Sequence, residues 1–337
     1  MKVSVRKISE ATGFSPATVS NALNYKKGVN AETAELVRSK AREMGYFETV
    51  GRISKIKFAM YKKDGTILED TPFFPLMLKG IEEESRALGF ELTVVNLERR
   101  NPDFDEQVRL LQNDQSSGVI LLATEFVDED ISIIRNMNVP FVVIDYWVED
   151  MSFDAVAATN QDSARMAVSY LISKGHRRIG YLAGNFRIKP FRARAAGVKI
   201  ALEKCGIQFD KKRDEVILTA NMDGAYRDMK EYLKTNPPLP TAFFADNDVI
   251  ALGAMKAMAE KGIRVPEDVS IVGFDDVSFS SISSPPLTTM RVPKLELGRA
   301  AVRRLNDVIR DQDDIKIKVQ MCTQFVERES VRDLNAG

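Results

Sequence analysis

The chain has 337 residues, more than one hydrophobic core usually organises, so we expect at least two structural units. With 44% hydrophobic and 28% charged residues and no apolar run long enough to cross a bilayer, the composition is that of a soluble globular protein and excludes a membrane-spanning one. The net charge of zero hides an asymmetry, because residues 1–57 carry 11 Lys and Arg against five Glu. This excess of six positive charges favours contact with nucleic-acid phosphates, although basic solvated faces are common.

The N-terminal residues and the cysteines indicate the compartment. The segment Met1–Lys7 turns polar and charged at once, which leaves no apolar core for a signal peptide. Cys205 and Cys322 lie far apart without metal-type spacing, as expected of unpaired thiols in a reducing cytoplasm. We therefore expect a cytoplasmic protein with no membrane partner.

A helix-turn-helix unit is predicted near the N-terminus. Ser4 is placed to cap a first helix that ends near Thr12, and a short turn follows. Ser15 and Pro16 suit the cap and the first position of a second helix. Such a pair is typical of domains that insert their second helix into a major groove, so residues 1–46 are predicted to bind DNA.

The second helix carries small polar residues on the side away from its apolar positions. Val19, Ala22 and Leu23 recur at helical spacing and should face the domain core, which leaves the other side for base edges and phosphates. The amide of Asn21 has both groups needed to pair with adenine. The predicted DNA-binding residues are Ser4, Ser15, Pro16, Ala17, Thr18, Ser20, Asn21 and Asn24. The alternative is a small helical bundle whose polar face meets only water.

From residue 57 onward, apolar strands alternate with amphipathic helices. Strands are expected at Lys57–Tyr61, Glu91–Val95, Gly118–Leu122, Phe141–Ile144, Ile179–Ala183, Thr241–Ala245 and Ser270–Phe274. Helices are expected near Pro75–Leu88, Asp103–Asn113, Asp128–Met137, Asp162–Lys174, Phe191–Cys205, Asp223–Lys234 and Val249–Lys261. This alternation predicts an α/β fold of two doubly wound parallel-sheet subdomains, with a ligand at strand ends or between the subdomains.

Several phrases resemble the lactose-repressor/galactose-repressor (LacI/GalR) family of transcriptional regulators. In the head they are Thr18-Val19-Ser20-x-x-Leu23-Asn24, Val29-Asn30-x-Glu32-Thr33 and Met44-Gly45-Tyr46. In the body they include Lys174–Ile179, Arg194–Gly197, Ala245–Gly253, Val272–Asp276 and Pro286–Thr289. The resemblance covers nearly the whole chain. It implies a three-helix DNA-binding domain joined to a core similar to the periplasmic binding proteins.

The resemblance also implies domain boundaries. The DNA-binding domain spans 1–46, a hinge 47–56, and the effector-binding core 57–332, with the N-subdomain at about 57–157 and 291–318 and the C-subdomain at about 158–290 and 319–332. Family members usually carry a hinge helix whose leucine wedges into the minor groove. Here the hinge is shorter and has no proline to start it and no leucine at the wedge position, which leaves minor-groove insertion open.

The ligand site is expected at the strand ends. Asp145, Asn247 and Asp275 each follow a predicted strand, and Arg194 offers a planar fork for hydroxyls or a carboxylate. Together with candidate stacking rings, the predicted set is Phe73, Phe74, Asp145, Trp147, Arg194, Asn247 and Asp275. Helix capping by Asn247 and Asp275 and ordinary packing of the aromatic residues are the structural alternatives. The family expectation for the ligand is a mono- or oligosaccharide.

Catalysis is not indicated. His176 is the only histidine, and the chain has no nucleophile elbow, dinucleotide fingerprint or metal-type spacing, so we expect no catalytic residue, metal or cofactor. The prediction is a homodimeric repressor, paired through helices 75–88 and 249–261 as in the family. It binds a pseudo-palindromic double-stranded operator under the control of a small-molecule effector, a sugar by resemblance. A cytoplasmic solute-binding sensor without operator-specific binding and an α/β enzyme are the competing classes.

Overall fold

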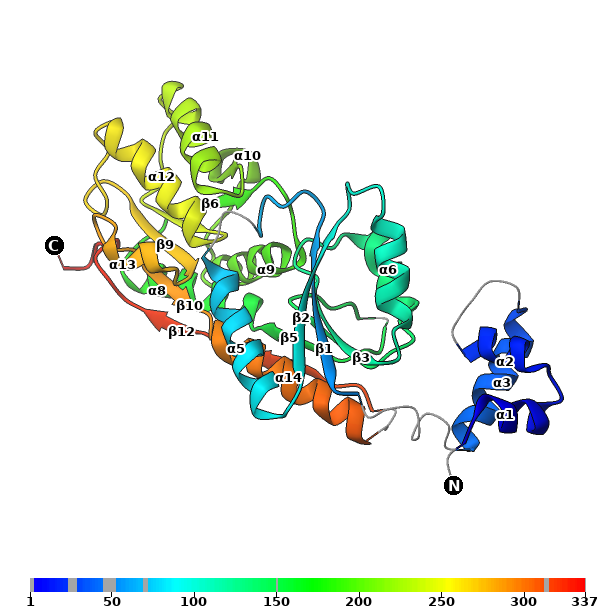
Figure 1. The fold of residues 1–337 in the computed structure, drawn as a ribbon. Coiled ribbons are helices and arrows are strands. Elements are labelled where there is room, and N and C mark those ends of the chain that lie inside the picture. Colours follow the sequence, from blue (N-terminus) through cyan, green and yellow to red (C-terminus); the bar gives the residue numbers. More distant parts are fainter. Residues whose placement is uncertain are drawn as a thin grey trace.

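The computed structural model describes residues 3–23, 29–44, 53–68, 72–149, 151–311 and 315–336. They form an all-helical head and an α/β core with two sheets (Figure 1). Within these residues no helix combines the length and the apolar character that crossing a membrane requires.

The head contains three helices, α1 (Val5–Thr12), α2 (Pro16–Leu23) and α3 (Ala31–Glu43). Side chains cap each of them: Ser4 accepts a bond from Lys7 N at 3.5 Å, Ser15 from Thr18 N at 3.1 Å, and Asn30 from Thr33 N at 2.7 Å. The apolar stripes meet in one cluster made of Ile8, Val19, Ala22, Leu23, Ala34, Val37 and Ala41. The predicted three-helix domain is confirmed.

The first half of the core is built on a parallel sheet with strand order β11-β5-β4-β3-β1-β2. Its strands are β1 (Lys55–Lys62), β2 (Glu91–Glu98), β3 (Ser117–Leu122), β4 (Phe141–Ile144), β5 (Ala155–Ala158) and β11 (Lys318–Met321). Its helices are α5 (Phe73–Ala87), α6 (Phe104–Asn113), η1 (Asp128–Asp130), α7 (Ile131–Arg135) and α14 (Lys294–Asp311). Every residue of the central strand β3 is buried, as expected of a sheet covered on both faces.

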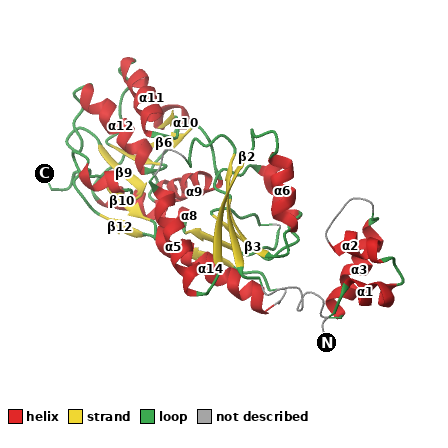
Figure 2. Cartoon of the chain, viewed as in Figure 1, coloured by secondary structure: helices red, strands yellow, loops and turns green. Residues whose placement is uncertain are grey.

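The second half repeats this order in the sheet β12-β10-β9-β8-β6-β7, in which only the β12 pairing is antiparallel. Its strands are β6 (Ile179–Gly184), β7 (Glu215–Leu218), β8 (Ala242–Ala245), β9 (Ser270–Asp275), β10 (Thr288–Arg291) and β12 (Gln324–Val326). Its helices are α8 (Asn160–Ser173), α9 (Lys189–Lys204), α10 (Lys211–Asp214), α11 (Met222–Lys234), α12 (Asp248–Glu260) and α13 (Ser278–Ile282). Helices lie on both sides of the strands in each half (Figure 2).

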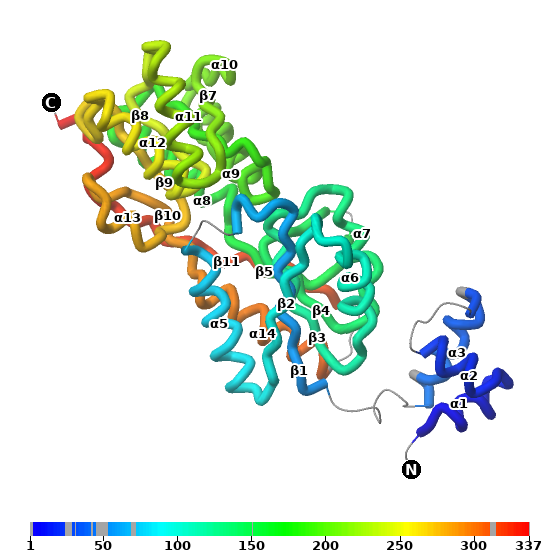
Figure 3. Tube along the Cα trace, turned by 45° about the horizontal axis from the view of Figure 1, so that its top comes forward, coloured from blue at the N-terminus to red at the C-terminus, as the bar shows by residue number. Residues whose placement is uncertain are grey.

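The chain passes between the two halves three times, from β5 to α8, from β10 to α14, and from β11 to β12. Figure 3 shows the late segments α14 and β11 lying beside the early strands of the first half. One hydrophobic cluster contains residues of both halves, among them Phe58 and Phe74 from the first and Phe244 and Phe274 from the second. Neither half is therefore a continuous stretch of sequence.

Two predicted boundaries need correction. Strand β1 begins at Lys55, so residues 55–56 belong to the sheet and not to the hinge. Ile56 is fully buried, but the lysines on either side of it made the apolar pattern hard to recognise in the sequence. Strand β11 pairs with β5, which places residues 319–321 in the first half and not the second. That boundary came from resemblance alone, because the half-exposed edge strand has no apolar run. Hinge residues 47–52 lie outside the described residues.

Candidate effector site and DNA-reading head

A pocket lies where the carboxyl ends of the two sheets meet. The first half contributes Ile67, Phe73, Phe74, Thr124 and Asp145, and the second half Ile188, Pro190, Phe191, Arg194, Asn247 and Asp275. In both sheets the order in which strands are added reverses here, between β1 and β3 and between β6 and β8, and doubly wound folds bind ligands at such points. The cavity volume is about 20 Å³, room for little more than one water molecule. A larger ligand therefore requires the lining side chains or the two halves to move apart.

Arg194 of α9 is the most heavily bonded residue of this pocket. Only 5% of it is exposed, and its guanidinium lies 3.7 Å from the centre of the Phe274 ring. Nε donates to Asn160 Oδ1 at 2.8 Å, Nη2 donates to Asp275 Oδ1 at 3.2 Å, and Nη1 donates to the carbonyl oxygen of Asp246. Three of its five N–H groups thus fix it within the protein, which makes it a rigid wall of the pocket.

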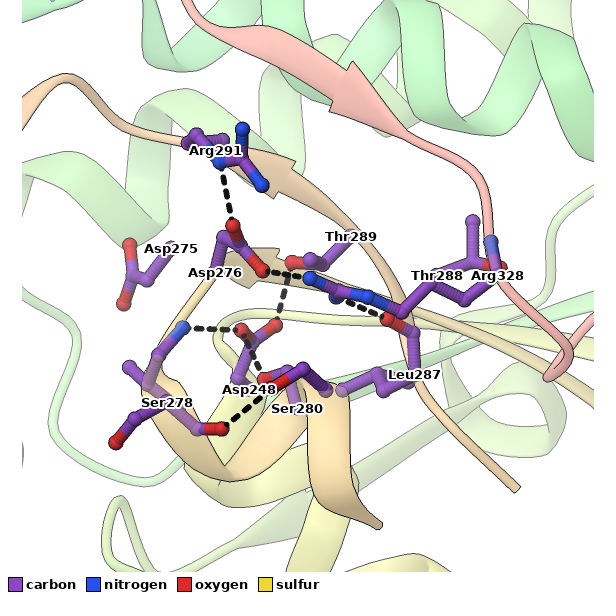
Figure 4. Close-up of polar contacts among 12 residues, drawn as sticks. Asp248, Asp275, Asp276, Ser278, Ser280, Leu287, Thr288, Thr289, Arg291 and Arg328 are labelled. Atoms are coloured by element: carbon purple, nitrogen blue, oxygen red, sulfur yellow. Dashed lines mark hydrogen bonds and ion pairs between the residues drawn. The ribbon is translucent and has the colours of Figure 1, made fainter. Parts of the chain in front are cut away.

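Asp275 is the last residue of strand β9 and Asp276 follows it, and their side chains point apart (Figure 4). Asp275 pairs with Arg194 at the pocket, and burial raises its pKa while Arg194 opposes that shift. Asp276 lies between Arg291 and Arg328, each at 2.6 Å. Both aspartates have positive φ angles, 110° and 51°, a region that residues with a side chain adopt only when their surroundings hold them.

Asp248, the first residue of α12, anchors the loop that follows β9 (Figure 4). It is fully buried, and its carboxylate accepts bonds from Val277 N at 3.0 Å, Ser280 Oγ at 2.6 Å and Thr289 Oγ1 at 2.6 Å. Burial, with a smaller contribution from the nearby Asp275 carboxylate, raises the pKa of Asp248 to about 7. Asp248 is not among the residues that line the pocket. It supports the pocket wall from behind.

Asp145 brings a carboxyl group of the first half to the pocket. It accepts a hydrogen bond from Thr124 Oγ1 at 2.9 Å, and its φ is 66°. Burial raises the pKa of Asp145 to about 7, against the opposing effect of Arg194. Near neutral pH this carboxyl group therefore exchanges between a form that only accepts hydrogen bonds and a form that also donates one.

The raised pKa of Asp145 predicts a pH dependence of stability. Between about pH 4 and about pH 7 the folded protein retains a proton that the unfolded chain releases, so this group's contribution to stability is present at low pH and lost as the pH rises. Asp145→Asn should flatten the decline of the free energy of unfolding across this window by up to about 1.4 kcal/mol per pH unit. Urea unfolding at several pH values measures it. Asp105→Asn, at a side chain that is 95% exposed, is the matched control, and parallel curves for all three proteins would refute the assignment.

The remaining predicted pocket residues divide in their roles. Asn247 lines the pocket and also caps α12, because its Oδ1 accepts from Ile250 N at 3.1 Å, so the capping alternative is confirmed for that oxygen. Phe73 and Phe74 line the pocket as an edge-to-face pair with ring centres 5.1 Å apart. Trp147 is not among the residues that line this cavity, and its ring lies 5.8 Å from Lys189 Nζ. The left-handed backbone at Asp145 ends the alternation of β4, so the strand could not predict the directions of the residues after it.

Five lining residues were missed, namely Ile67, Thr124, Ile188, Pro190 and Phe191. Thr124 follows the end of β3, and the three residues 188, 190 and 191 follow the end of β6. The signal that identified Asp145, a position just beyond a buried strand, was present for them as well. Ile67, Ile188 and Pro190 were not counted because ligand contacts were sought among polar and aromatic side chains, a reason that does not apply to Thr124 and Phe191.

His176 has a structural role. It is buried, with Nδ1 3.0 Å from Thr241 Oγ1 and Nε2 3.2 Å from the carbonyl oxygen of Arg332, and burial lowers its pKa. It joins the loop before β6 to the C-terminal segment. The expectation that it packs and does not catalyse agrees with this placement.

On the head, helix α2 presents the predicted DNA-binding face to solvent. Val19, Ala22 and Leu23 are buried, whereas Ser15, Pro16 and Ala17 are exposed and Thr18, Ser20 and Asn21 are partly exposed. Ser4 and Ser15 cap α1 and α2, which orients their main chains at the helix starts. Asn24 lies outside the described residues. The face is thus formed by short side chains at the beginning of α2, which permit close approach to a groove.

A helix-turn-helix head and a two-half α/β core with a pocket between the halves define a ligand-controlled DNA-binding regulator. The chain belongs to the LacI/GalR family of transcriptional regulators. It is 30% identical over 332 residues to the HTH-type transcriptional repressor PurR of Pasteurella multocida (strain Pm70), covering 97% of this chain and 98% of the relative. It is also 30% identical over 346 residues to PurR of Haemophilus influenzae (strain PittEE), with 98% and 99% covered. A periplasmic binding protein-like domain model matches residues 168–331.

Solved structures share the fold along the chain. The transcriptional regulator CelR in complex with cellobiose has a TM-score of 0.74 at 26% identity, covering 98% of this chain and 100% of that one. The lac repressor dimer bound to operator and the anti-inducer ONPF has a TM-score of 0.73 at 26% identity, with the same coverage. The protein is thus a DNA-binding transcriptional repressor with a ligand-binding core, and not an enzyme.

Proposed function

We propose that this repressor controls carbohydrate-related genes as a homodimer on a pseudo-palindromic operator, and that a sugar bound between the two halves of its core is the effector. The observation that carries the sugar is the composition of the pocket. Carboxyl groups of Asp145 and Asp275, the Arg194 fork and the Asn247 amide stand among apolar rings. Sugars combine hydroxyl edges with apolar faces and match this mixture.

Related structures support the same ligand class. CelR was solved with cellobiose, and a LacI family transcriptional regulator from Enterococcus faecium, 25% identical with a TM-score of 0.69, was solved with bound ribose. The two sugars differ in size, so the family fold accommodates a range of them. The cavity of about 20 Å³ must widen for either sugar, and for a disaccharide more than for a pentose.

The proposed homodimer uses α5 and α12. Leu76 on α5 is 49% exposed, and on α13 Phe279 is 49% and Ile282 76% exposed, so apolar side chains are available to a partner beside both helices. A two-fold dimer places two reading heads on two half-sites, which explains the expected pseudo-palindromic operator. The lac repressor structure, a dimer on its operator, supports this arrangement.

Operator reading by α2 is tested with Asn21→Ala. Loss of a base contact should weaken binding to the protein's own upstream DNA by about 1–3 kcal/mol while leaving the salt dependence unchanged, since no phosphate contact is removed. Fluorescence anisotropy of the full-length protein over a salt series measures both quantities. Ser39→Ala on the exposed side of α3 is the control. If Asn21→Ala and Ser39→Ala bind the upstream DNA with equal affinity, Asn21 does not contact the operator bases.

The effector is tested in the same assay with cellobiose, ribose and a purine base. A change of operator affinity with one sugar identifies the effector and gives the sign of the coupling. A change of operator affinity with the purine base alone would overturn the proposal that the effector is a sugar. If the protein binds sugar but shows no preference for its upstream DNA, the solute-sensor alternative holds instead.

A further inference from the structure

Lys294 joins the two halves of the core next to the pocket. It is the first residue of α14, directly after the chain crosses back from β10, and only 5% of it is exposed. Its Nζ donates to the carbonyl oxygens of Asp275 and Asp276 in the second half, the latter at 3.0 Å. The same Nζ lies 5.4 Å from the ring centre of Phe73, which opens α5 in the first half. One buried cation therefore contacts pocket-lining residues of both halves.

The carbonyl oxygens that Lys294 binds belong to the two residues with positive φ at the end of β9. Their side chains are held by Arg194, Arg291 and Arg328, and the Asp275 carbonyl oxygen also accepts a long main-chain bond from Val292 N at 3.5 Å. Lys294 holds the main chain itself. Because a buried ammonium group is costly unless it gains bonds, its presence here favours a role in keeping this turn in place.

Helix α14 cannot move without α5. A Cβ at Gly80 of α5 would stand 2.1 Å from the Leu295 carbonyl oxygen, and a Cβ at Gly298 of α14 would stand 2.3 Å from the Met77 carbonyl oxygen. The two helix backbones therefore touch at both points and behave as one rigid pair. This pair carries Lys294 at the start of one helix, and Phe73 and Phe74 of the pocket at the start of the other.

We propose that Lys294 is a positioning residue that transmits pocket occupancy between the halves of the core. Ligand contact with Asp275 displaces the turn at the end of β9, Lys294 follows its two carbonyl oxygens, and the α5–α14 pair moves with it. The inference rests on the proposed effector function of the pocket. It extends that function by naming the residue through which the second half acts on the first.

The test compares Lys294→Met, which keeps the length but removes the charge, with Lys294→Arg, which keeps charge and donors. Lys199→Met, at a side chain that is 75% exposed on α9, is the control. Operator affinity of the full-length proteins is measured with and without cellobiose and ribose. In Lys294→Met the ratio of the two affinities should fall to about one from the roughly 5–150-fold that allosteric coupling typically gives. Lys294→Arg should retain most of this ratio and Lys199→Met all of it. An unchanged ratio in Lys294→Met overturns the proposal.

A second readout needs no ligand. Trp147 is the only tryptophan, and it lies on the first half within 5.8 Å of Lys189 on the second, so its emission reports their spacing. Lys294→Met should alter the emission and acrylamide quenching of Trp147, and Lys294→Arg should restore both. If Lys294→Met does not fold, Lys294→Gln replaces it. If no sugar changes operator binding of the wild-type protein, only the proposal of a sugar effector fails. If Trp147 emission is unchanged in Lys294→Met, the proposed role of Lys294 is overturned.

Discussion

Replacing Arg194 with methionine is expected to lower the free energy of unfolding by about 3–5 kcal/mol, because it leaves a buried carboxylate without its counter-charge. The side chains of Arg194 and Asp275 are 6% and 8% exposed, so water cannot compensate for the lost ion pair. Asn160 Oδ1 and the Asp246 carbonyl oxygen also lose their donors. Urea unfolding of the full-length protein at neutral pH measures the loss.

Three further variants establish the cause of that loss. Arg192→Met, at an exposed position of the same helix, should change stability by less than about 0.5 kcal/mol. Adding Asp275→Asn to Arg194→Met should recover part of the loss, since the double variant buries no unpaired charge. The loss should also shrink in acid, because the unpaired carboxyl group of Asp275 has a raised pKa and its protonated form is stable at low pH. A double variant that is no more stable than Arg194→Met alone would contradict this explanation.

Replacing Glu125 with alanine is expected to be similarly damaging, for a different reason. Glu125 is fully buried, and its carboxylate accepts five main-chain N–H bonds from the loop after β1. Oε2 accepts from residues 63, 64 and 65 at 2.8–3.2 Å, and Oε1 accepts from residues 67 and 68 at 2.9 and 3.3 Å. Each buried amide left without a partner costs about 1–3 kcal/mol, so even partial replacement by water leaves a loss of about 3 kcal/mol or more.

Glutamine should not rescue this position, because its NH₂ group would face amide donors where an oxygen is needed. Glu129→Ala is the control, since the Glu129 side chain is 88% exposed and forms a long ion pair of 3.9 Å with Lys63 Nζ. Besides the loss in urea unfolding, release of the loop should expose the Lys63–Asp64 bond, and trypsin should cleave both Glu125 variants there faster than the control. A Glu125→Gln protein as stable and resistant as the wild type would show that the carboxylate is dispensable.

The buried strands could be predicted because their apolar runs are continuous. All seven predicted strands exist, within a few residues at their ends, since strands covered on both faces carry the strongest pattern. Five described strands were missed. The edge strands β7, β11 and β12 are short and partly exposed, and the buried strands β5 and β10 consist of four residues each with mostly small or polar side chains, Ala155–Ala158 and Thr288–Arg291. Helix α14 was missed although Leu297, Ala301 and Leu305 recur at helical spacing, because its dense charges obscured that stripe.

The pocket was predictable to the extent that it follows one geometric rule. Asp145, Asn247 and Asp275 stand at the ends of parallel strands or within two residues of them, so their convergence followed from the fold class. Glu125 and Lys294 could not be found in this way, because both bind main-chain atoms of segments distant in sequence. A carboxylate or ammonium group that serves a distant backbone leaves no complementary side-chain pattern to recognise.

The three passages between the halves determine the order in which a ribosome can complete this protein. The strands β1–β5 leave the exit tunnel early, but Leu297, Val302 and Leu305, which pack in their core cluster, lie on α14, and the edge strand β11 ends at Met321. The second half receives β6–β10 as one uninterrupted stretch of chain. Both halves therefore wait for the C-terminal part of the chain, the first for α14 and β11 and the second for β12. Until α14 has been made, the early strands of the first half lack the helix that covers their apolar face.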